Sequence, residues 1–194
     1  MQLYKDVMLL KSLVNVEKKF IDVSNSSTAF PTNTTGTLVL LNGIDAGGTQ
    51  VQRTGNSIKI TSLMLEGFIT LNASATNDMC KVSLILDKQP NGAVASWSDI
   101  FEVGSGSSAT AQRNKLTVDR FVVLKQFDMT LATAGDTNKK FKCYEKLSLH
   151  EKFSGNGNTI ASVYTNAIYL CFQGNLSANF SNISYFSRIR FVDN

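Results

Sequence analysis

The sequence contains few of the residues on which most enzymes and metal proteins depend. Its 194 residues include one histidine, three cysteines and two prolines. A metal site built from several imidazoles is therefore excluded, and a histidine-based triad could use only His150. The three cysteines are odd in number, lie far apart and form no Cys-x-x-Cys pair, so neither structural zinc nor a disulfide framework is expected. We predict that the protein is not an enzyme and that Cys80, Cys143 and Cys171 are small core residues.

Long apolar runs are also missing. No run reaches the roughly 18 residues that a membrane helix needs. The first 20 residues carry lysines throughout and contain no small-residue cleavage site, so we expect no signal peptide and no membrane partner. With 43% hydrophobic and 18% charged residues the chain can bury the core of one domain. Its net charge of +4 mildly favours a polyanionic partner.

Residues 1–17 form the one stretch with a clear helical pattern. Val7, Leu10 and Val14 recur at spacings of three and four, which is typical of an amphipathic helix. Such a helix would pack either on the core of its own chain or, as an arm, against other copies. We therefore divide the chain into a helical arm, residues 1–17, and a β domain, residues 18–194.

Alternation of apolar and polar residues dominates the β domain. It predicts eight strands, at residues 18–23, 37–42, 57–71, 79–87, 120–132, 141–153, 160–173 and 183–193. A change of phase in the third predicts a bulge near Thr61–Ser62. We also expect one helical turn at residues 97–103, capped by Ser98. No crossover helix separates the strands, so the predicted fold is all-β, an eight-stranded antiparallel jelly roll of two four-stranded sheets.

Most short motifs in the chain have a structural interpretation. Asp45-Ala-Gly-Gly-Thr49 is similar to a phosphate loop of sugar kinases, but the chain is too short for their two lobes, so we interpret it as an ordinary loop. Several aspartates are scattered without EF-hand spacing, and calcium held between subunits by such carboxylates remains open, with no other cofactor expected. These aspartates are Asp87, Asp99, Asp119, Asp128 and Asp193.

Two groups of basic residues stand out. Arg188 and Arg190 alternate on one predicted strand and so share a face, and Lys139, Lys140 and Lys142 cluster at the start of another. The simpler interpretation is a solvated surface. The functional one is contact with phosphates, or with acidic groups of a neighbouring subunit.

Three ordered segments carry a family resemblance. They are Arg53–Gly67; Val82–Ala93 followed by Ser98–Ile100; and Asp119–Lys125, with Ser187–Asp193 closing the chain. In this order and spacing they resemble capsid proteins of small circular single-stranded DNA viruses that encode a replication initiator. They are equally similar to the capsid protein of satellite tobacco necrosis virus. The resemblance runs from about Val16 to the C-terminus.

The resemblance implies a coat protein whose single jelly roll assembles, as 60 copies, into a T=1 icosahedral shell around single-stranded nucleic acid. It implies a place in the virion, after synthesis in the host cytoplasm or nucleus, and it names no host receptor. In the satellite-virus relatives a basic arm precedes a helix that bundles inside the shell. Met1–Lys19 resembles that helix, so the residues expected to contact nucleic acid are Lys5, Lys11, Lys18 and Lys19. No arginine-rich arm precedes them here, which weakens the expectation of genome binding more than that of shell formation.

A second hypothesis keeps the fold and changes the function. A non-viral jelly-roll binding module, lectin-like or a trimeric ligand domain, would also need no catalytic residues. A cupin-like enzyme would need several histidines for its metal, and this chain has one. Self-assembly separates the first two hypotheses, because only a coat protein forms closed shells.

Overall fold

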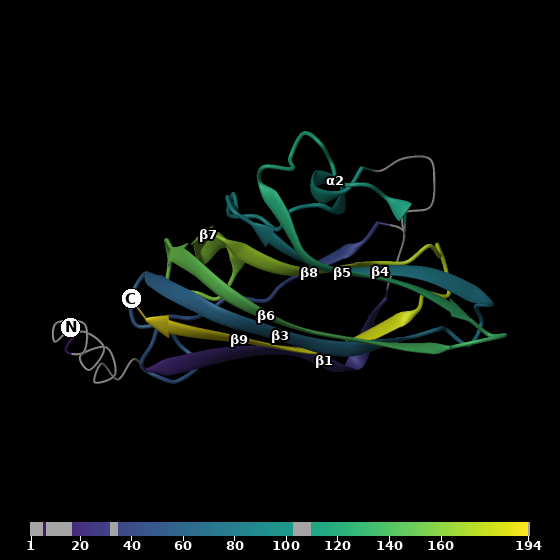
Figure 1. The fold of residues 1–194 in the computed structure, drawn as a ribbon, viewed down its shortest axis with the longest axis horizontal. Coiled ribbons are helices and arrows are strands. Elements are labelled where there is room, and N and C mark those ends of the chain that lie inside the picture. The colour runs from purple at the N-terminus through teal and green to yellow at the C-terminus, as the bar shows by residue number, and fades with distance from the viewer. Residues whose placement is uncertain (1–5, 7–16, 32–34, 103–109, 194) are drawn as a thin grey trace.

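A computed structural model of the chain describes residue 6 and residues 17–31, 35–102 and 110–193. Two antiparallel sheets form a sandwich, ordered β1-β9-β3-β6-β7 and β2-β8-β4-β5 (Figure 1). The strands are β1 (Lys18–Pro31), β2 (Thr37–Leu40), β3 (Ser57–Thr70), β4 (Asn77–Asp87), β5 (Phe121–Ala132), β6 (Asn138–Phe153), β7 (Val163–Thr165), β8 (Ala167–Gln173) and β9 (Asn182–Asp193). The helices are α2 (Trp97–Ile100) and the 3-10 turn η2 (Ile160–Ser162).

The all-β fold class is confirmed, with one correction to the sheets. The segment expected to hold one strand, residues 160–173, contains η2, β7 and β8, so one sheet has five strands rather than four. The break falls at Asn166, whose φ of 62° is left-handed and ends the extended run. The Asn166 side-chain amide donates to the carbonyl of His150 at 2.7 Å and holds this turn against β6.

The predicted bulge in β3 is confirmed. The pairing of β3 with β6 and with β9 shifts register between Ile60 and Ser62. Ile58 and Ile60 lie buried before the shift, and Leu63 and Leu65 lie buried after it. The bulge therefore keeps apolar side chains in the core although the sequence changes parity.

The predicted helical turn exists as α2, but its cap is Ser96 and not Ser98. The Ser96 hydroxyl accepts from the backbone N–H of Asp99 at 3.2 Å, and the Asp99 carboxylate accepts from the N–H of Ser96 at 2.7 Å. This is a capping box, which needs the residue three before the aspartate. Trp97 stacks on Phe101, with ring centroids 4.3 Å apart.

The segment between β4 and β5 covers the outer face of the four-stranded sheet. α2 lies on that sheet, on the side away from the five-stranded one (Figure 1). Its buried Trp97, Ile100 and Phe101 join the same apolar cluster as the core between the sheets. The four-stranded sheet is consequently buried on both faces, which explains why every residue of β8 is buried.

The cysteines are core residues, as predicted. Cys80, Cys143 and Cys171 are buried and form no disulfide within the described residues, and burial raises the pKa of the Cys143 and Cys171 thiols. The predicted arm, by contrast, falls almost entirely outside the described residues, which include only Asp6 and Glu17 of it. In the described part of the chain no helix is long and apolar enough to cross a membrane.

Candidate nucleic-acid interface

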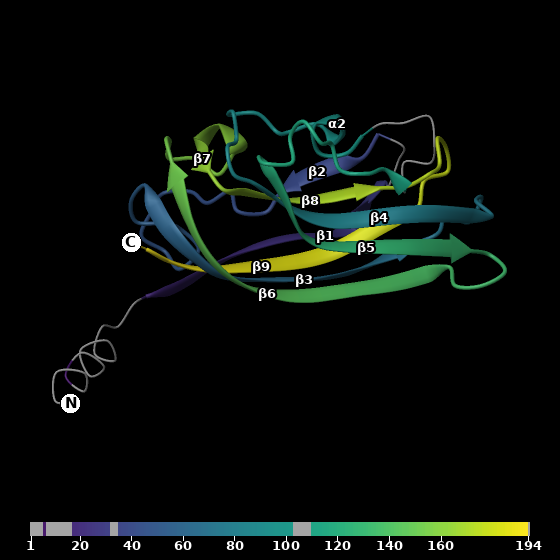
Figure 2. The same ribbon diagram turned by 45° about the horizontal axis from the view of Figure 1, so that its top comes forward.

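The outer face of the five-stranded sheet has no described segment over it (Figure 2). The charged side chains that the sequence places on this face are mostly basic. Side chains alternate along its strands, with every second one turned into the sandwich. The side chains that point outward include eight basic residues and two acidic ones. Their net charge is +6, whereas the net charge of the whole chain is +4. These residues are Lys18, Lys59, Lys140, Lys142, Lys146, Lys152, Arg188 and Arg190, with Asp22 and Glu66.

Strand pairing brings these charges together from distant parts of the sequence. Ser62 of β3 stands between Lys146 of β6 and Arg190 of β9. The two acidic residues are each matched: Arg188 binds Asp22 through two hydrogen bonds of 2.7 and 2.6 Å, and Lys142 lies 3.2 Å from Glu66. The hydrogen bonds that Arg188 donates to the Asp22 carboxylate raise the pKa of the guanidinium. Within the described residues, the six remaining basic side chains form no ion pair.

Aromatic rings interleave with these charges. Arg188 lies over the ring of Phe20, 4.6 Å from its centroid, and 5.7 Å from that of Phe186. Phe68 and Tyr144 are 45% and 53% exposed on the same face. Exposed rings beside a row of cations suit single-stranded nucleic acid, because bases stack on the rings while cations follow the phosphates.

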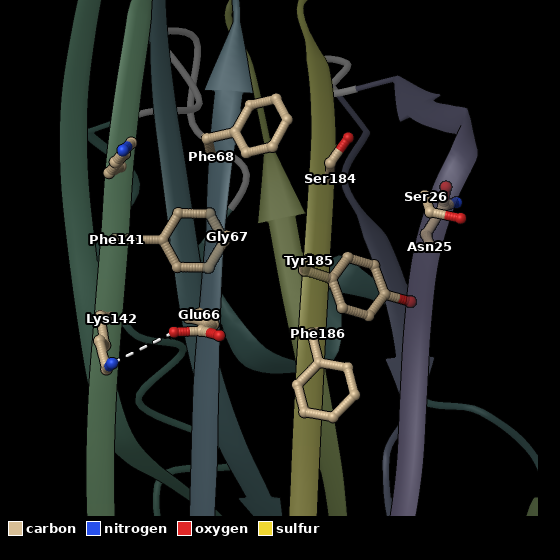
Figure 3. A pocket seen from close by; sticks show the side chains of 11 residues that line it. Asn25, Ser26, Glu66, Gly67, Phe68, Phe141, Lys142, Ser184, Tyr185 and Phe186 are labelled. Carbon is tan, nitrogen blue, oxygen red and sulfur yellow. Dashed lines mark ion pairs between the residues drawn. The ribbon is translucent and has the colours of Figure 1, made fainter.

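A hollow of about 470 Å³ lies at one end of this face (Figure 3). Residues from β1, β3, β6 and β9 line it. Gly67 is one of these residues, and no larger side chain fits there: a Cβ would lie 2.4 Å from the Ser184 carbonyl oxygen and 2.6 Å from the Phe141 ring. Phe68 and Phe186 supply apolar surface, and Glu66 and Lys142 form an ion pair at its rim.

The four predicted lysines have different surroundings. Lys18 is exposed on the basic face, while Lys5 and Lys11 lie outside the described residues. Lys19 points the opposite way from Lys18 and is 1% exposed. Its ammonium lies 2.8 Å from an Asp193 carboxylate oxygen and donates to the Thr54 hydroxyl at 3.0 Å. Lys19 was expected to contact nucleic acid, but in the folded chain its ammonium instead holds β1 to the end of β9.

The contact with Lys19 changes the pKa of the Asp193 carboxyl. Burial alone would raise the pKa of its carboxyl, but hydrogen bonds from Lys19 and Thr54 lower that pKa below its usual value. The Asp193 carboxylate is thus charged at neutral pH.

Arg53 and Glu151 are buried charged residues that the sequence did not predict to be buried. Arg53 is fully buried at the end of the loop before β3, and its guanidinium lies 4.0 Å from the centroid of the Phe153 ring. Glu151, on β6, is also fully buried. Alternation along β6 places Glu151 on the face opposite His150. Arg53 lies in a loop, where no alternation applies.

The described residues contain no cluster of three or more His, Cys, Asp or Glu side chains that could hold a metal ion. His150 is exposed on the basic face. Calcium shared between subunits stays a prediction.

Comparison with solved structures gives matches of low identity. The chain is similar to dimeric latent PorU from Porphyromonas gingivalis (7% identity, TM-score 0.42), covering 94% of this chain but only 13% of that one. It is similar to the structure of Broad Bean Stain Virus, with 11% identity and a TM-score of 0.37, over 92% of this chain and 86% of that one. It is also similar to the 60-mer BFDV capsid protein, with 9% identity and a TM-score of 0.30, over 90% of this chain and 88% of that one. At these TM-scores the three matches carry no further argument. No curated protein matches the chain.

The family comparison is decisive, because it covers almost the whole sequence. A family model described as geminivirus coat protein/nuclear export factor BR1 matches residues 11–194, which include the entire sandwich and the basic face. This agrees with the capsid resemblance carried by the three sequence segments. The chain belongs to the geminivirus coat protein/nuclear export factor BR1 family.

Proposed function

We propose that this protein is a coat protein that assembles, as 60 identical copies, into a T=1 shell around single-stranded nucleic acid. In the proposed shell the bare basic face of the five-stranded sheet points inward, toward the genome. The observation that carries the proposal is the one-sided distribution of charge, with a balance of +6 on one sheet face of a family member whose whole chain carries +4.

The two outer faces of the sandwich support different tasks. The four-stranded sheet is covered by its own β4–β5 segment, which exposes Val94, Leu116 and Val118. The five-stranded sheet presents cations and rings with no described segment over them. Contacts with phosphates are independent of sequence, as packaging of a whole genome requires. Identical copies joined by heterologous contacts close into a shell when their rotations fit a point group.

Assembly is tested by negative-stain electron microscopy of the purified chain, with light scattering on the same sample. We expect uniform round particles that hold nuclease-protected nucleic acid. The test is run across salt concentrations, with calcium and with a chelator, because a structural calcium ion between copies would make assembly calcium-dependent. A monomer or trimer under every condition would contradict the proposal and favour the jelly-roll binding module.

The inward face is tested by removing two of its cations. Lys146→Ser with Lys152→Ser is expected to weaken binding of a single-stranded oligonucleotide. The slope of log K against log salt should become shallower by about 1.4, since each of the two lost phosphate contacts removes about 0.7. The measurement is fluorescence anisotropy of a labelled oligonucleotide at salt concentrations from about 50 to about 200 mM.

The matched control changes the net charge equally on the opposite side. Lys88→Ser with Lys115→Ser removes two exposed cations of the β4–β5 segment. We expect the wild-type slope from this control. Equal slopes for both double variants would contradict the assignment of the basic face.

A further inference from the structure

We infer that the hollow beside Glu66 binds a guanine base of the packaged strand in preference to the other bases. The inference rests on the proposed function and adds one local preference to phosphate contacts that are otherwise independent of sequence. Its basis is the chemistry of the rim, where the Glu66 carboxylate and the Lys142 ammonium lie side by side next to aromatic rings (Figure 3).

The hollow has the size and surface for an unstacked base. Its volume, about 470 Å³, falls within the range of small-ligand sites. Glu66 is paired across strands with Phe186, and Phe68 with Ser184, so the two rings are diagonal neighbours on β3 and β9. A base splayed out of a single strand gains stacking energy on such rings, whatever its identity.

The phosphates have cations at the same place. Lys140 is paired with Phe68 and Lys142 with Glu66, so both lysines stand on β6, next to the rings. Lys140 forms no ion pair among the described residues, and the Lys142 side chain is 69% exposed. Charge and apolar surface at this hollow therefore match a nucleotide, with the base over β3 and β9 and the phosphate over β6.

The Glu66–Lys142 pair supplies the preference. A carboxylate only accepts hydrogen bonds, and its two oxygens match two parallel N–H donors. Guanine is the base whose Watson–Crick edge offers two adjacent donors, at N1 and N2, followed by the O6 acceptor. Glu66 would accept from N1–H and N2–H, and the Lys142 ammonium would donate to O6. Thymine, uracil, cytosine and adenine each present at most one donor group on that edge, beside acceptors that a carboxylate repels.

The test compares oligothymidines that differ in one central base. We expect the purified chain to bind the strand with a central guanine about tenfold more tightly than those with adenine, cytosine or thymine, the size of one good bidentate base contact. Hypoxanthine, which lacks the N2 amino group, should fall between guanine and the rest. Binding is measured by fluorescence anisotropy at fixed salt.

Glu66→Gln identifies the residue responsible. Glu66 is half-exposed, so the variant is expected to fold, and it should bind all four strands within about twofold of one another. Glu102→Gln, an exposed carboxylate of the β4–β5 segment, is the matched control and should keep the preference for guanine.

The outcomes separate this inference from the function on which it rests. Equal binding of all strands by the wild type, or a guanine preference that survives in Glu66→Gln, overturns the inference and leaves the proposed function standing. Failure to bind any strand at low salt overturns the proposed function.

Discussion

Arg53→Met is expected to lower the free energy of unfolding by about 3–5 kcal/mol, the cost of breaking a buried charged network. The Arg53 guanidinium donates to the carbonyl of Ile44 at 3.1 Å, to the Asn56 side-chain oxygen at 3.1 Å, and to the carbonyls of Gly55 and Gly155. It thereby ties the loop before β3 to the loop after β6. Methionine fills much of the volume over Phe153 but leaves these acceptors without a donor.

Chemical unfolding followed by intrinsic fluorescence measures this loss. Arg190→Met, which removes an exposed arginine of the basic face, is the matched control and should change stability by less than about 0.5 kcal/mol. A loss below about 1 kcal/mol for Arg53→Met would mean that water or the loops themselves satisfy the freed carbonyls.

Glu151→Gln is expected to remove a fall in stability at high pH. The Glu151 side chain is fully buried, and in the described part of the chain neither of its carboxyl oxygens has a hydrogen-bond partner. Burial raises the pKa of this carboxyl well above its usual value, and the nearby Asn42 amide and Arg53 guanidinium offset this only in part. Glu151 is therefore neutral in the folded chain over a range of pH in which it is ionised in the unfolded chain.

The sign of the effect follows from linkage. Because the folded-state pKa is raised, the stability linked to this group is full below the unfolded pKa, about 4.3, and falls as pH rises toward the folded pKa. The slope in that window is about 1.4 kcal/mol per pH unit. Glutamine cannot ionise. In thermal unfolding from about pH 4 to about pH 9, the stability of the variant relative to the wild type should therefore increase as pH rises. Parallel curves would contradict the account.

Glu145→Gln is the control for this experiment. Glu145 lies on the same strand, six residues earlier, and is partly exposed. We expect it to follow the pH profile of the wild type.

The sequence predicts β3, β6 and β9 well because each of these strands buries one face. The alternation along β6 and β9 marks the inward residues, and the change of phase in β3 marks its bulge. The sequence pattern fails where local hydrogen bonds determine where a strand or helix begins or ends. The turn at Asn166 splits a strand, and the capping box selects Ser96 over Ser98.

The site is harder to predict because it is assembled by pairing between distant strands. Alternation shows that Lys146 and Arg190 each point outward, but not that β3 places them on one surface. Lys18 and Lys19 are adjacent in sequence and fall on opposite faces of β1, so their shared charge is a poor guide to a shared role. Arg53 has its partners in loops, where no periodicity applies.

The most direct test of the account is to map which residues touch the packaged strand. Assembled particles are irradiated with ultraviolet light, digested, and searched by mass spectrometry for peptides cross-linked to nucleotides. We predict cross-links at Phe68, Tyr144 and Phe186 on the bare face of the five-stranded sheet, and none at Trp97 or Phe101 of the β4–β5 segment. Cross-links confined to the β4–β5 segment would contradict the account, because the basic face would then point away from the genome.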